Sequence, residues 1–190
     1  MKKVLFILPA LLLASGLVAY ADLEGSASAH VYVKVDPNVA VGAQAIVDAG
    51  TVQTGEFCAT VQFRVDANLQ AVCLYAAASP LFKGDDPGND EVLPIPLALS
   101  SGIEIAPTNA NPMEGGTNVA AYTSTEVDID GFPGTTTEMI CFESSQNNHF
   151  SQDVFVTVCW NQDDPEKPTG EYSGKVKLWA LLMPEAPSGS

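Results

Sequence analysis

The four cysteines are the residues whose chemistry is most directly readable: Cys58, Cys73, Cys141 and Cys159. In exported proteins an even number of cysteines indicates disulfides, and four cysteines allow three pairings. The first two flank a turn candidate and the last two flank a polar loop, so each pair can join neighbouring strands of a hairpin. We therefore predict the bonds Cys58–Cys73 and Cys141–Cys159. The alternative, a four-cysteine zinc site, lacks any C-x-x-C spacing.

Carboxylates alternate along the segment Glu126-Val127-Asp128-Ile129-Asp130-Gly131, with a glycine where a calcium loop turns. Glu126, Asp128 and Asp130 are therefore candidate ligands of a structural calcium ion. An EF-hand is excluded, because no helices flank the segment and Thr137 occupies the position of the bidentate glutamate. Solvated turns are the competing interpretation here, as they are for the acidic loops at 85–91 and 163–166.

Catalytic chemistry has little support. The two histidines are His30 and His149, and no G-x-S-x-G segment accompanies them for a Ser-His-Asp site. His149 lies in a polar loop, where a capping or hydrogen-bonding role is expected. Acidic loops alone do not establish a glycosidase pair. We expect that the protein is not an enzyme, and a hydrolase is the weakest alternative.

The amino end has the pattern of a targeting segment. Met1-Lys2-Lys3 precedes an apolar run over residues 4–13, and Ala19-Tyr20-Ala21 follows it. A basic start, a short apolar core and an A-x-A site predict a cleaved signal peptide over residues 1–21. The run is too short to span a membrane, so we expect export to the periplasm, the cell surface or the extracellular space, with no membrane span in the mature chain.

The chain is strongly acidic. Its 8 basic and 23 acidic residues give a net charge of −15, and losing the two lysines of the signal peptide would bring it to −17. A surface this negative repels nucleic acid and anionic lipid, so neither is expected as a partner.

Short strand patterns fill the rest of the chain, at 57–65, 71–77, 92–99, 102–106, 119–122, 126–129, 138–143, 154–160 and 174–183. Turn-forming clusters such as Gly131-Phe132-Pro133-Gly134 separate them, and no amphipathic helix of 11 residues follows the signal peptide. This predicts an all-β protein with a single antiparallel, immunoglobulin-like β-sandwich over residues 43–183 and a flexible tail at 184–190. Pro94 and Pro96 place 92–99 at a sheet edge or on a crossing between sheets.

The strand with the clearest alternation precedes this sandwich, within residues 22–42. Its apolar positions are separated mostly by polar residues, which predicts one buried face: Val31, Val33, Val35, Val39 and Val41. It has no hairpin partner close by in sequence, and small residues dominate the linker that follows. Adding such a strand to an open sheet edge is a known mode of association. We therefore interpret 22–42 as a candidate donor strand.

Two segments carry a family resemblance. Ala29-His30-Val31-Tyr32-Val33-Lys34-Val35-Asp36-Pro37-Asn38-Val39 resembles the N-terminal extension of chaperone-usher pilins of the colonisation-factor type, in which alternating valines run into Asp-Pro. Residues 168–178 are similar to the last strand of that class and of spore coat protein U-like domains. The resemblance implies a pilin-like fimbrial subunit whose N-terminal strand fills the groove of the next copy, with 174–182 lining that groove. It implies copies of the same chain and a periplasmic chaperone as partners.

The alternative is a monomeric, self-complemented sandwich that binds a glycan or a calcium-dependent ligand. Three aromatic side chains are candidates for such a surface: Tyr122, Phe132 and Trp179. Packing in the core is the competing interpretation for all three.

Overall fold

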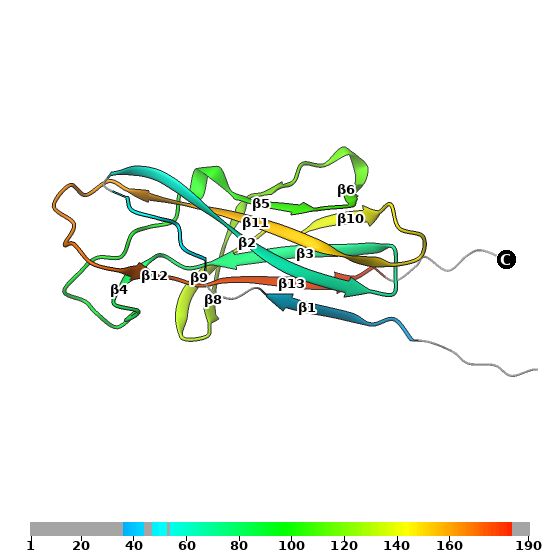
Figure 1. Ribbon diagram of the computed structural model, residues 1–190, viewed down its shortest axis with the longest axis horizontal. Coiled ribbons are helices and arrows are strands. Elements are labelled where there is room, and N and C mark those ends of the chain that lie inside the picture. The colour runs from blue at the N-terminus through cyan, green and yellow to red at the C-terminus, as the bar shows by residue number, and fades with distance from the viewer. Residues whose placement is uncertain (1–35, 44–46, 53, 184–190) are drawn as a thin grey trace, which may run out of the picture. The chain divides into compact units, whose positions relative to one another are not determined.

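The computed structural model describes residues 36–43, 47–52 and 54–183. These residues form an all-β protein in which every strand pairing is antiparallel (Figure 1). The predicted antiparallel sandwich is therefore confirmed. The predicted signal peptide and tail lie outside the described residues, as do Val31, Val33 and Val35.

Two sheets make up the sandwich. Sheet A has five strands in the spatial order β1 (Val39–Ala43), β2 (Gly55–Ala67), β11 (Phe150–Gln162), β5 (Ile103–Pro107) and β7 (Val119–Ala120). Sheet B contains six: β6 (Ala110–Pro112), β10 (Ile140–Ser144), β3 (Ala71–Ala78), β9 (Phe132–Thr137), β8 (Tyr122–Ile129) and β13 (Val176–Leu182). In sheet B, β3 has β13 along one side and both β10 and β9 along the other.

The remaining elements are short. A two-stranded ribbon joins β4 (Phe82–Lys83) to β12 (Tyr172–Ser173), and two 3₁₀ turns occur at η1 (Leu99–Ser101) and η2 (Met113–Gly115). The segment with two prolines crosses between elements as predicted, because Ile95 bridges Leu81 while Leu97 bridges Trp160 of β11.

The core follows from the strand alternation. In β11, Val154, Val156 and Val158 are fully buried and alternate with more exposed residues that face outward. They pack in one cluster with inward side chains of sheet B, among them Leu74 and Phe142. Burial of apolar side chains on both inner faces is what holds the two sheets together.

The prediction that residues 131–134 form a turn between strands is wrong, because Phe132, Pro133 and Gly134 belong to β9 of the β8–β9 hairpin. Only Asp130 and Gly131 turn, with φ of +52° and +90°, the positive φ values that a two-residue type I′ hairpin requires. Pro133 then falls opposite Asp128. This position follows the hydrogen-bonded pair that closes the turn, so the N–H that proline lacks costs no bond to β8.

Candidate functional site

Two edge strands lie on the same side of the sandwich. Among the described residues β1 pairs only with β2, and β13 pairs only with β3. The two strands belong to different sheets and lie next to each other (Figure 1). Each therefore has one backbone edge without a strand partner, the kind of edge to which another chain can add. We call this pair of strands the β1/β13 edge.

Apolar side chains at this edge point inward without being covered. Val41 pairs with Val65, so the two side chains face the same side of sheet A. Val65 is fully buried, whereas 40% of Val41 is exposed. The sandwich therefore leaves part of its interior face open at β1.

The β13 side of the edge behaves in the same way. Its inward residues pair with fully buried positions of β3, yet only Leu178 is itself buried. The other three inward side chains contact the core but are only partly buried: Val176, Ala180 and Leu182. A further strand added along the open edge of β1 or of β13 would cover part of this surface.

Two of the five predicted donor valines are described, and both belong to the sandwich. Val39 and Val41 lie in β1 and pair with Ala67 and Val65 of the same chain. Since β1 continues to Ala43, it crosses the predicted boundary between residues 42 and 43.

Asn68 holds the start of β1, a role that sequence analysis missed. Its Oδ1 accepts from the Asn38 N–H at 2.7 Å, and its Nδ2 donates to the Asp36 carbonyl at 3.0 Å. Its own N–H donates to the Asn38 carbonyl at 3.3 Å. Asparagine in a turn commonly bonds nearby backbone, but the sequence cannot reveal partners about thirty residues earlier. The chain therefore enters β1 beside the β2–β3 turn.

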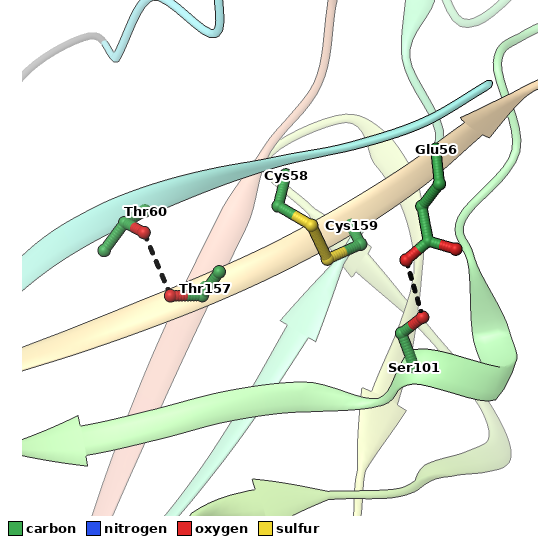
Figure 2. The surroundings of a disulfide bond; sticks show 6 residues. All are labelled: Glu56, Cys58, Thr60, Ser101, Thr157 and Cys159. Carbon is green, nitrogen blue, oxygen red and sulfur yellow. Dashed lines mark hydrogen bonds between the residues drawn. A yellow bond between two sulfur atoms is a disulfide. The ribbon is translucent and has the colours of Figure 1, made fainter.

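The predicted disulfide pairing is wrong. The structure joins Cys58 to Cys159 and Cys73 to Cys141, with Cα–Cα distances of 4.0 and 3.9 Å. Each bond links residues directly opposite each other on neighbouring strands of one sheet. Figure 2 shows the Cys58–Cys159 bond between β2 and β11.

The reason for the error is that the hairpins do not exist. β2 belongs to sheet A and β3 to sheet B, so the chain changes sheets at the turn that separates Cys58 from Cys73. It changes sheets again between β10 and β11, which separates Cys141 from Cys159. The first pair of cysteines therefore lies on the outer faces of opposite sheets and cannot meet.

Figure 2 also shows the one group of three potential metal ligands found among the described residues: Glu56, Cys58 and Cys159. The two sulfur atoms are bonded to each other, so neither is a thiolate ligand. The Glu56 carboxylate accepts a hydrogen bond from Ser101 at 2.9 Å. With its disulfide formed, this group is not a metal site.

The candidate calcium ligands lie on the β8–β9 hairpin but do not form a ligand cluster among the described residues. Asp128 accepts the Gly131 N–H at 3.1 Å and so stabilises the turn. Asp130 lies 3.8 Å from Lys177 Nζ on β13. Two of the three carboxylates thus have protein partners, and calcium binding by Glu126, Asp128 and Asp130 stays a prediction.

The three candidate ligand-binding aromatics pack against the protein. Phe132 is buried edge-to-face on Phe82, with ring centroids 5.9 Å apart. Tyr122 is half-buried, and burial raises the pKa of its hydroxyl. Trp179 stacks on Tyr75 at 5.0 Å. Core packing therefore accounts for Phe132, and no ligand surface made of these three rings is evident.

His149 is tied to its own loop, with Nδ1 2.8 Å from the Asn147 carbonyl, and His30 lies outside the described residues.

The helical turns of the described chain include none with the length and apolar character of a membrane span. Comparisons with protein-family models, curated proteins and solved structures find no match to the chain.

Proposed function

We propose that the protein is an exported structural subunit of a pilus-like surface fibre, in which the N-terminal segment of one copy adds as a strand to the β1/β13 edge of the next. One observation carries the proposal. Val41 points inward and is 40% exposed, while its neighbour Val65 is fully buried. Within the described chain, the sandwich thus presents a partly exposed inward side chain beside two backbone edges that have no strand partner.

The donor is shorter than the 22–42 segment expected from sequence. We assign the donor role to residues 29–35, because Asn68 holds residues 36 and 38 and β1 pairs within its own chain. Its apolar side chains are Val31, Val33 and Val35. This donor has seven residues, the same length as β13, so one extended segment can run along the whole edge strand.

The free energy gained by burying the donor valines is of the same order as the cost of association. Burying three valines at about 1.5 to 3 kcal/mol each gives roughly 5 to 9 kcal/mol. Association costs about 4 to 15 kcal/mol in lost freedom, so the valines alone do not guarantee assembly. Main-chain hydrogen bonds to the edge must supply the rest, which makes an extended donor paired along its length necessary.

Two further features fit export. Both disulfides are formed, and such bonds persist in oxidising compartments. An uncovered edge also invites incorrect pairing before assembly, which is the situation in which a periplasmic chaperone would be needed.

The test compares the full mature chain with a variant lacking residues 22–35, which keeps β1 intact. We expect the full chain to polymerise in sedimentation and electron microscopy, and the shortened chain to stay monomeric. A synthetic peptide of residues 29–35 should bind the shortened chain one to one and protect the amides of β13 from hydrogen exchange. The matched control is a peptide with Val31, Val33 and Val35 replaced by serine, which should not bind.

Two results would contradict the proposal. One is polymerisation of the shortened chain to the same extent as the full chain. The other is a full chain that stays monomeric at all concentrations with residues 29–35 protected from exchange, which would favour a self-complemented binding module.

A further inference from the structure

An open cavity of about 360 Å³ lies next to the end of β13, and it is formed mainly by segments outside the β1/β13 edge. Its walls come from η2 and the segment after it, from β7, and from the residues that lead into β10. It contains every methionine of the described chain: Met113, Met139 and Met183.

Three separate segments bring these methionines together. Pro112 pairs with Phe142 of β10, so Met113 follows beside Cys141 at the start of η2. Met139 directly precedes β10, and Met183 directly follows β13. Cys141 also lines the cavity, but it is bonded to Cys73. The sulfur atoms of this lining that are not in a disulfide are thus three thioethers.

Packing alone does not explain this arrangement. Methionine usually fills irregular gaps in a core, where its side chain is buried. Here Met139 is 52% exposed and Met183 is 37% exposed, at the same opening. Two exposed carboxylates, Glu114 and Glu138, line the cavity as well. They make the opening anionic, which favours a cation over an apolar partner.

The ligand set selects the ion. Thioether sulfur is a soft ligand, which suits Cu(I) and does not suit calcium, magnesium or manganese. Each methionine has three rotatable side-chain bonds, so thioethers that line one cavity can turn toward a common ion. No free cysteine occurs in the described chain to compete for it.

We propose that this cavity binds one soft monovalent cation, Cu(I) or its analogue Ag(I), through the sulfur atoms of Met113, Met139 and Met183. Glu114 and Glu138 raise the local concentration of the cation and offset its charge. The evidence for the site does not rest on strand addition, so the proposal holds whether or not the protein polymerises.

The test uses the full mature chain with both disulfides intact, confirmed by the absence of free thiols. Ag(I) is titrated by calorimetry and native mass spectrometry, and Cu(I) by anaerobic competition with a chromogenic chelator. We expect one ion per chain. Replacing all three methionines by leucine conserves volume, so the fold should survive, while affinity should fall by about tenfold or more. Replacing Glu114 and Glu138 by glutamine should weaken binding less.

The matched control replaces His30 and His149 by glutamine and should leave the affinity unchanged. An excess of Zn(II) should not displace Ag(I), because thioethers are poor ligands for zinc. The proposal is overturned if neither ion binds at micromolar protein, if the folded triple leucine variant binds as tightly as the natural chain, or if only the histidine variant loses binding.

Discussion

The centre of sheet A and its β1 edge differ in how completely they are closed. The β2–β11 pair runs through thirteen register positions, carries a disulfide and lies against buried valines. The outer side of β1 has no strand partner in the described chain, and its inward Val41 is partly exposed. The central β2–β11 pair, which we call the frame, thus has strand partners along both edges, whereas β1 has one along a single edge among the described residues.

Removing the covalent link should test the frame most severely. We expect Cys58→Ala with Cys159→Ala to lower the free energy of unfolding by about 2 to 5 kcal/mol, because the bond spans 101 residues and restricts the unfolded chain. Urea denaturation measures the loss. The matched variant, Cys73→Ala with Cys141→Ala, opens a loop of 68 residues and should cost somewhat less. Equal stability of the first variant and the natural chain would contradict the idea of a reinforced frame.

The paired valines Val65 and Val41 allow a direct comparison of β2 with the β1 edge. Val65→Ala empties a fully buried position and should cost about 2 kcal/mol in the isolated subunit. Val41→Ala should cost less than about 1 kcal/mol there, since much of that side chain is already in water. In the assembled fibre the difference between these two costs should become smaller if a donor strand covers Val41. If Val41→Ala lowers the free energy of unfolding of the monomer by as much as Val65→Ala does, the edge is already closed.

Removing the Asn68 anchor of β1 should have a smaller effect on the free energy of unfolding. Asn68→Ala removes two side-chain hydrogen bonds to residues 36 and 38 and should cost about 1 to 2 kcal/mol. Hydrogen exchange should show faster amide exchange in β1, with little change in β11. Uniformly faster exchange across both strands would show instead that β1 is an integral part of the frame.

The smallest expected effect is on the outer face of the frame. Hydrogen bonds from Arg64 and then from Ser151 lower the pKa of Asp66 below its ordinary value of 3.8. This interaction therefore stabilises the fold above about pH 4 and is lost as the pH falls through the lowered pKa. A carbon-detected NMR titration should show the pKa of Asp66 rising in Arg64→Gln, and rising less in Ser151→Ala. An unchanged pKa in both variants would exclude this cause.

Local patterns predicted the fold well. Alternation in 57–65 and 154–160 located the cores of β2 and β11, and the prolines at 94 and 96 indicated a crossing segment. In the structure Cys58 and Cys159 alternate with the more buried residues of β2 and β11, and so face outward. What failed was the choice of partner strand, since a turn between two strands does not say whether they share a sheet.

The candidate sites were less predictable. Asp130-Gly131 lies in the segment with the candidate calcium ligands, and Asp-Gly between apolar strands is also a strong hairpin signal. The cluster of Met113, Met139 and Met183 could not be predicted from sequence, because the three residues lie on separate segments that only the strand register brings together. The exposure of the inward Val41 likewise depends on β1 having one strand partner in the described chain, which the sequence pattern does not show.

The nested disulfides also determine how the molecule would respond to mechanical load. A force that enters through β1 and leaves through β13 passes directly from Cys58 to Cys159, and the chain between them is bypassed by that bond. Only the short stretches outside the loop can be drawn out while the bond holds. A subunit built in this way would extend little under tension, a property suited to a filament that must resist stretching.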